Sequence, residues 1–162
     1  MQVLKHASYP QTGIFHTHHE VLRFSTECCL EFRDITDTIE EVILRAGIHT
    51  GTINIQSRHT TATILVNENE PLLITDMKRA LERAASQKRK YSHDDFTIRT
   101  VNMEPDEEPN GHAHCKALFL RASETLNLVE GNLQLGRWQR IFFVELDRAR
   151  DRSISVLIQG IR

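Results

Sequence analysis

The chain has 162 residues, of which 40% are hydrophobic and 26% charged, so we expect residues 1–162 to form one ordinary globular domain with a buried core. A formal net charge of -2 excludes a strongly basic surface, and no apolar run reaches membrane-spanning length, so neither nucleic acid nor a membrane is expected as a partner. The sequence shows no signal-peptide pattern and no paired spacing of its cysteines, which favours a cytoplasmic protein with reduced thiols.

Residues 1–27 are predicted to form two strands around a turn at residues 9–13, where proline and glycine occur together. The second strand carries His16, His18 and His19. Because neighbouring side chains on a strand point to opposite faces, only His16 and His18 share a face. We therefore predict an exposed polar strand face here rather than a metal site.

A scaffold helix is predicted after Asp34, which is the expected N-cap. Acidic residues crowd its first turns and Arg45 lies near its end, as the helix dipole favours. Gly47 is the expected C-cap. The apolar side of the helix has the spacing of a buried face and consists of Ile35, Ile39, Val42, Ile43 and Ala46.

The segment of residues 58–68 is the densest in chemically active side chains. Read as a strand, it turns apolar residues to one face and a largely polar set to the other, namely His59, Thr61, Thr63 and Asn67. Such a strand is either the floor of a small-molecule site or a half-buried strand whose threonines reflect β-propensity. Residues 51–57 form a strand before it, so the two are one long bent strand or a closely paired set.

Pro71 suits the first turn of a helix that extends to Ala84. Asp76 lies inside this helix, where aspartate is disfavoured. It therefore lies either on the solvent face or toward a polar site at the end of the preceding strand.

Residues 86–110 are rich in charge and turn formers, and a loop of that length is typically functional or disordered. Tyr91, His93 and Asp94 bring a phenol, an imidazole and a carboxylate into this loop. A helix is predicted next, with His112 and His114 at its start. The helix N-terminus disfavours imidazolium, so both are expected to be neutral near pH 7 and either to bind metal or act as bases, or to be satisfied by caps and backbone.

The last third of the chain is predicted to be rich in strands. A hairpin turn is expected at residues 131–132, and a long apolar strand ends in Glu145 and Asp147. Arg148, Arg150 and Arg152 follow in a charged turn before a final strand over residues 153–160. These groups form either surface ion pairs of little energetic weight or a set of guanidinium groups that holds a phosphorylated ligand.

The sequence resembles the YjbQ family of small proteins, also described as secondary thiamine-phosphate synthases. The matching motifs occur in the family's order and spacing from about residue 34 to residue 160, and they are His59-Thr60-Thr61-Ala62, Asn67-Glu68, Asp76, Tyr91-x-His93, Asn110 with Ala113-His114, Gly131 with Leu135-Gly136-x-Trp138-Gln139, and Glu145-x-Asp147. The resemblance implies an α+β fold with a mixed, strongly bent sheet and flanking helices. It also implies a homotrimer and a weak activity that joins a pyrimidine-methyl diphosphate to a thiazole phosphate with release of diphosphate.

Three positions depart from the family pattern. Arg148-Ala149-Arg150 stands where the family usually has Gly-Pro-Arg, Arg121 stands in place of a glycine, and Cys115 in place of a leucine. The altered turn after Asp147 bears on any phosphate contact that this loop makes, whereas the histidine motifs are intact.

The resemblance implies a site for a small phosphorylated metabolite. The expected catalytic residues are His59, His93, His114, Glu68 and Asp76, and the expected ligand-binding residues are Thr60, Thr61, Asn67 and Asn110. Two arrangements compete. In one, a divalent ion such as Zn²⁺ binds to His93, His112 and His114. In the other, neutral histidines act as acid and base, Thr60 and Thr61 bind an anion, and Mg²⁺ arrives with the diphosphate.

Two further function classes remain open at this point. One is a metal-dependent hydrolase, which predicts that chelation abolishes activity and Zn²⁺ restores it. The other is a non-catalytic protein that binds a metal or a phosphometabolite without turning it over.

Overall fold

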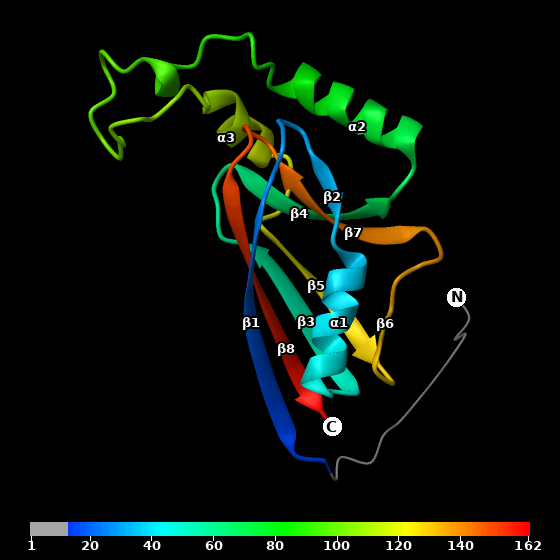
Figure 1. Ribbon diagram of the computed structural model, residues 1–162. Coiled ribbons are helices and arrows are strands. Elements are labelled where there is room, and N and C mark those ends of the chain that lie inside the picture. Colours follow the sequence, from blue (N-terminus) through cyan, green and yellow to red (C-terminus); the bar gives the residue numbers. More distant parts are fainter. Residues whose placement is uncertain (1–12) are drawn as a thin grey trace.

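Two antiparallel sheets organise the computed structural model, which describes residues 13–162 (Figure 1). The larger sheet has the strand order β1 (Phe15–Ser25), β8 (Asp151–Ile161), β3 (Thr50–Ser57), β5 (Ser123–Val129) and β6 (Asn132–Leu133). The smaller sheet has the order β2 (Phe32–Asp34), β7 (Gln139–Glu145) and β4 (Ala62–Glu68). The predicted α+β domain with a bent sheet is confirmed. The expected mixed pairing is not observed, because every pairing among the described strands is antiparallel.

Three α-helices flank these sheets. Figure 1 shows α1 (Thr36–Ala46) lying along the larger sheet, whereas α2 (Pro71–Ala84) and α3 (Gly111–Ala117) lie at the end of the molecule that holds β4 and β7. The long segment between α2 and α3 contains one short 3₁₀ turn, η1 (Ser92–Asp94). No helix in the described part of the chain combines the length and the apolar character that crossing a membrane requires.

The ends of α1 follow the predicted signals with a shift of one residue. The Asp34 side chain accepts hydrogen bonds from the backbone N–H and the hydroxyl of Thr36 at 3.0 and 2.7 Å, although Ile35 occupies the cap position. At the other end Gly47 adopts φ +61° and donates its N–H to the Ile43 carbonyl at 3.1 Å, as a glycine C-cap does. The helix therefore starts one residue after the predicted position and ends at the predicted one.

Strand β7 joins two hydrophobic cores. Ile141 and Phe143 pack into the core between α1 and the larger sheet, and Phe142 and Val144 pack into the core beneath α2 and α3. The strand is thus buried on both faces, which explains its unbroken apolar sequence. It also fixes the position of Glu145 at its end, deep inside the protein.

The first residues of the segment 58–68 are not part of a strand. Strand β4 begins only at Ala62, so the prediction of a strand through His59, Thr60 and Thr61 is wrong. The physical reason is that β3 and β4 belong to different sheets, and the chain turns between them. The predicted turn at residues 9–13 lies largely outside the described residues.

Candidate functional site

A cavity of about 640 Å³, here called the first cavity, opens where the turn between the two sheets meets the loop before α3. The residues around it come from three parts of the chain: the turn after β3, the loop from η1 to α3, and the turn between β7 and β8. They include nine of the predicted or considered residues, namely His59, Thr60, Thr61, His93, Asn110, His114, Arg148, Arg150 and Arg152. The fold therefore brings together side chains that lie up to 94 residues apart in sequence.

Arg152 and Glu145 form a buried ion pair behind the cavity wall. The guanidinium contacts both carboxylate oxygens, with Nε to Oε2 at 2.6 Å and Nη2 to Oε1 at 2.5 Å. Arg152 Nη2 also donates to Thr61 Oγ1 at 3.0 Å. Glu145 is fully buried, so the alternative of surface ion pairs does not hold for this carboxylate. The pair fixes Thr61, whose hydroxyl is already engaged as an acceptor.

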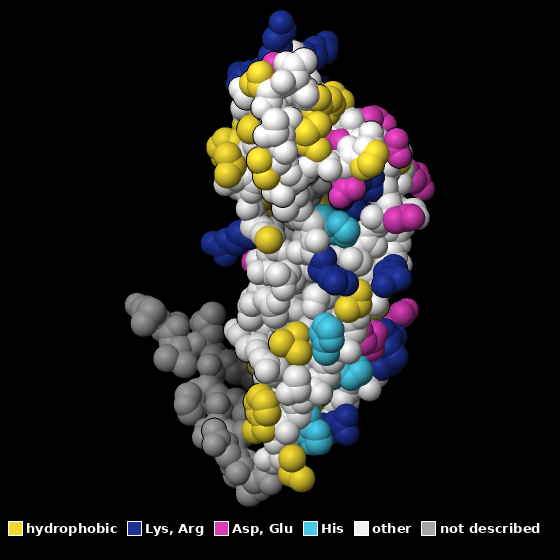
Figure 2. Space-filling model, turned by 90° about the vertical axis from the view of Figure 1, so that its left-hand side faces the viewer, with side chains coloured by type: hydrophobic (Ala, Val, Ile, Leu, Met, Phe, Trp, Pro, Cys, Tyr) yellow, Lys and Arg dark blue, Asp and Glu magenta, His cyan; other side chains and the backbone are white. Residues whose placement is uncertain are grey.

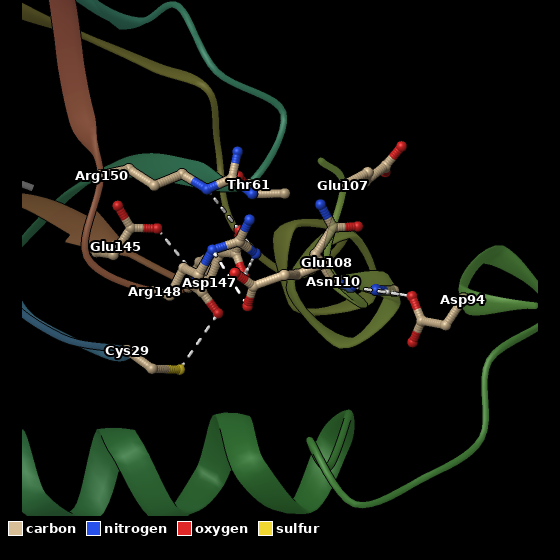
Figure 3. Close-up of polar contacts among 12 residues, drawn as sticks. Cys29, Thr61, Asp94, Glu107, Glu108, Asn110, Glu145, Asp147, Arg148 and Arg150 are labelled. Atoms are coloured by element: carbon tan, nitrogen blue, oxygen red, sulfur yellow. Dashed lines mark hydrogen bonds and ion pairs between the residues drawn. The ribbon is translucent and has the colours of Figure 1, made fainter. Parts of the chain in front are cut away.

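Asp147 holds two more arginines of the same turn. Its carboxylate lies 2.9 Å from Arg150 Nε and 3.4 Å from Arg148 Nη1, and Figure 3 shows both side chains converging on it. Arg148 also lies 3.6 Å from Glu108 on the opposite loop. Asp147 is itself buried, whereas both arginines keep part of their surface open at the cavity. The departure from the family pattern at position 148 thus adds one cation, Arg148, to the cavity wall.

Arg99 organises the long loop on the other side of the cavity. Its guanidinium donates to Glu107 at 2.7 Å and to the backbone carbonyls of His93 and Asn102 at 3.3 and 2.5 Å. The hydrogen bond from Arg99 lowers the pKa of the Glu107 carboxyl. The loop is therefore an ordered wall, held by one cation and its acceptors.

Asp94 ties this loop to α3. Its Oδ1 accepts the backbone N–H groups of Asn110 and Gly111 at 2.9 and 2.8 Å, as drawn in part in Figure 3. The carboxylate thus satisfies N–H groups at the start of the helix that have no partner within the helix itself. This contact sets the position of Asn110 and His114 at the cavity.

His93 and His114 lie edge to face, with ring centroids 4.6 Å apart. Burial lowers the pKa of His114, and the neighbouring His93 lowers it further, so His114 is neutral near pH 7 as predicted. His93 Nε2 and Asn110 Oδ1 are buried and have no hydrogen-bond partner among the described residues. Buried polar atoms are normally paired, so these two identify the part of the cavity that suits a polar ligand.

His59 lies on the turn between the sheets and accepts a hydrogen bond. The Ser153 backbone N–H donates to His59 Nε2 at 2.8 Å, which places the ring proton on Nδ1. Burial lowers the pKa of His59, and the positive charge of Arg152 lowers it further. His59 is therefore a neutral imidazole with one N–H to donate.

His112 does not join the predicted metal set. It is buried, and its Nδ1 lies 3.1 Å from the ammonium of Lys116, which also contacts Glu82 at 3.1 Å. Two residues along a helix separate His112 from His114 by roughly half a turn, so the two rings diverge. Within residues 13–162, no group of three or more histidine, cysteine or acidic side chains is arranged to hold a metal ion. The residues present therefore do not fit the predicted Zn²⁺ site.

Three predicted site residues lie away from the first cavity in this chain. Asn67 and Glu68 are at the far end of β4, roughly 20 Å from Thr61 at the rise of an extended strand. The Asn67 amide contacts Met77, and the exposed Asp76 pairs with Arg79 at 3.4 Å. The expectation that they join the histidines is not met within a single chain, because a motif that is continuous in sequence is extended in space.

Sequence reasoning missed Arg58, Arg99 and Glu107, all of which line the cavity. Arg58 directly precedes the His59 motif, and that adjacency was a usable signal. Arg99 and Glu107 lie in a polar loop without periodicity, so nothing in the sequence indicated that they pair.

Comparison with known proteins identifies the family and the fold of the chain. Residues 20–161 match the family model described as UPF0047 protein YjbQ-like. A UPF0047 protein of Methanothermobacter thermautotrophicus is 34% identical over 149 residues, which cover 91% of this chain and 96% of that protein. A crystal structure from Sulfolobus solfataricus, described as a YbjQ-like protein of unknown function, has a TM-score of 0.80 at 34% identity and covers 91% of this chain and 99% of that one. A hypothetical protein from Aeropyrum pernix has a TM-score of 0.72 at 31% identity, with 87% and 98% covered. This chain belongs to the YjbQ family.

Proposed function

We propose that the first cavity binds a phosphorylated small molecule and that the chain has a secondary thiamine-phosphate synthase activity. The reaction would couple a pyrimidine-methyl diphosphate to a thiazole phosphate and release diphosphate. The observation that carries the proposal is a pair of buried polar atoms without a hydrogen-bond partner, His93 Nε2 and Asn110 Oδ1, on a cavity lined by arginines, histidines and three carboxylates. The nearest carboxylate to His93 Nε2 is that of Glu107, at 3.9 Å.

Five arginines and three carboxylates line the first cavity, so the charge of its lining is net positive and favours an anion. Arg58 has no ion-pair partner within the described part of the chain. Arg148 and Arg150 share the carboxylate of Asp147, and Arg148 has a second, longer contact of 3.6 Å with Glu108. Guanidinium groups match phosphate oxygens through paired hydrogen bonds. A ligand with several phosphate oxygens would thus complete contacts that the protein leaves open.

The chemistry requires mainly that the leaving group be held and water excluded. As the bond between the methylene carbon and diphosphate breaks, negative charge grows on the diphosphate oxygen, where the arginines and neutral histidines supply hydrogen-bond donors. His59 has an Nδ1 proton available for this purpose. In this proposal Mg²⁺ arrives with the diphosphate as part of the substrate.

The decisive assay mixes the purified chain with both phosphorylated precursors and Mg²⁺ and follows the product by mass spectrometry. Product formed in proportion to protein concentration supports the proposal. Tight binding of the diphosphate precursor, with no product after long incubation, would instead assign the chain to a non-catalytic phosphometabolite-binding class.

We also propose that the chain assembles as a homotrimer in the cytoplasm. The resemblance supports the trimer. Glu68 and Asp76 lie away from the first cavity of their own chain, so they would reach a first cavity only on a neighbouring chain. Sedimentation equilibrium is expected to give about three times the 18.7 kDa mass of the chain. A species at 18.7 kDa at all concentrations would contradict this assembly.

A further inference from the structure

The five arginines that line the first cavity differ in how firmly the protein holds them. Arg99, Arg150 and Arg152 each lie within 2.9 Å of a carboxylate oxygen. Arg148 comes no closer than 3.4 Å to a carboxylate, whereas Arg58 has no ion pair in the part of the chain that the structure describes. Because charge-assisted hydrogen bonds of a guanidinium normally measure about 2.7–2.9 Å, Arg148 is only loosely held.

Arg148 connects two segments on opposite sides of the first cavity. Its Nη1 lies 3.4 Å from Asp147 on its own turn, and its Nε lies 3.6 Å from Glu108 on the loop before α3. Figure 3 shows the side chain between these two carboxylates. In the upper part of Figure 2, where the segment between α2 and α3 lies, acidic and basic side chains occur side by side. The contact between Arg148 and Glu108 is here called the strap.

Arg148 can leave the strap without leaving a buried charge unpaired. Asp147 is buried but keeps Arg150 at 2.9 Å, and the Glu108 side chain is 68% exposed and stays hydrated. An exposed ion pair contributes little to stability, so exchange of Glu108 for a stronger acceptor is favourable. Arg152, by contrast, compensates a fully buried carboxylate and cannot move in this way.

We propose that Arg148 is a specificity-determining residue, which exchanges Glu108 for a phosphate group of the ligand and thereby favours a diphosphate over a monophosphate. This inference rests on the proposed function, because it requires a phosphorylated ligand in the first cavity. Among the arginines of this cavity, Arg58 and Arg148 are the two least engaged by carboxylates, and they come from different segments. A ligand with two linked phosphate groups offers an acceptor to each of them, whereas a monophosphate offers an acceptor to one.

This selectivity is assigned to this chain and not to the family as a whole. Arg148 stands where the family usually has glycine, which has no side chain to form a strap or to reach a second phosphate. The turn after Asp147 therefore adds a cation to a cavity whose histidine motifs follow the family pattern.

Isothermal titration calorimetry of the full chain with inorganic diphosphate, and separately with inorganic phosphate, tests the role of Arg148 without requiring turnover. Both titrations contain Mg²⁺ and about 0.15 M salt, which screens distant exposed charges. Arg148→Gln is expected to weaken diphosphate binding by about tenfold or more and phosphate binding by no more than about twofold. Arg83→Ala, which removes an exposed arginine from α2, is the matched control and is expected to bind both probes as the native chain does.

The strap itself is tested from its acidic side. Glu108→Gln removes the group that competes with the ligand for Arg148, so it is expected to strengthen diphosphate binding by about three- to fivefold. Asp106→Asn removes the same charge from the same loop and is expected to change that affinity by less than about twofold. In the Arg148→Gln background, the effect of Glu108→Gln is expected to shrink to that of Asp106→Asn.

Three results would overturn the role of Arg148: an unchanged preference for diphosphate in Arg148→Gln, equal effects of Glu108→Gln and Asp106→Asn in the native background, or no binding of diphosphate at millimolar concentration. The proposed function fails separately. If the variants behave as expected but no coupled product forms, Arg148 selects a diphosphate in a protein that does not turn it over. If product forms and the variants show no coupling, the synthase activity stands and the strap does not.

Discussion

Replacement of Glu145 by alanine is expected to lower the free energy of unfolding by about 3–5 kcal/mol. Four hydrogen bonds converge on this fully buried carboxylate, two from Arg152 and one each from the Thr26 hydroxyl and the Asp147 backbone N–H. Without it, the Arg152 guanidinium stays buried with its charge uncompensated. Urea denaturation at a fixed chain concentration measures the loss.

The control for this prediction is Glu41→Ala. Glu41 lies on the surface of α1 and approaches Arg45 only to 3.9 Å, so its removal is expected to leave the urea midpoint unchanged. The double variant Glu145→Met with Arg152→Met is expected to recover much of the stability lost in Glu145→Ala, because it removes the unpaired charge and keeps the volume filled. A Glu145→Ala variant within 1 kcal/mol of the native chain would show that solvent or a local shift compensates Arg152.

The elements that could be predicted from the sequence are those whose signals are local. Asp34 and Gly47 bound α1 through contacts within two to four residues, and the hairpin at Gly131 has a positive φ that glycine tolerates. The apolar run of β7 is also a local signal. It indicated a buried strand, because a strand that is buried on both faces needs no polar positions.

The candidate site could be predicted only in part, because its geometry depends on contacts between distant segments. The motif residues His59 and His114 do line one cavity. The predicted strand over residues 58–68 itself implied that Glu68 lies far from His59. However, nothing local to the sequence shows that the ammonium of Lys116 engages His112. The helical spacing of His112 and His114 did indicate diverging faces, but not which of the two rings faces the cavity.

His59 is expected to act as a hydrogen-bond donor through Nδ1, and two substitutions separate that role from its structural one. Asparagine places an amide N–H near the position of Nδ1 but cannot accept the hydrogen bond from Ser153. Glutamine reaches the position of Nε2 and can accept that bond, but it provides no donor at Nδ1. In the coupling assay His59→Gln is therefore expected to lose about 10²–10³ in kcat, whereas His59→Asn keeps a larger share of the native rate.

The pH profile gives an independent test of the same role. Burial and the charge of Arg152 lower the pKa of His59 below its ordinary value of 6.5, so the ring is neutral above that pH. Protonation would place a second N–H on Nε2, directly against the Ser153 N–H that it now accepts, and would remove the hydrogen bond that orients the ring. The coupling rate of the native chain is therefore expected to be constant above pH 6.5 and to fall as the pH decreases through the lowered pKa. His59→Gln, which has no group titrating at this position, is expected to lose that part of the profile.

If His59→Gln retained the native rate and His59→Asn lost it, acceptance from Ser153 would be the whole role of His59, and the Nδ1 proton would have no part in holding the leaving group.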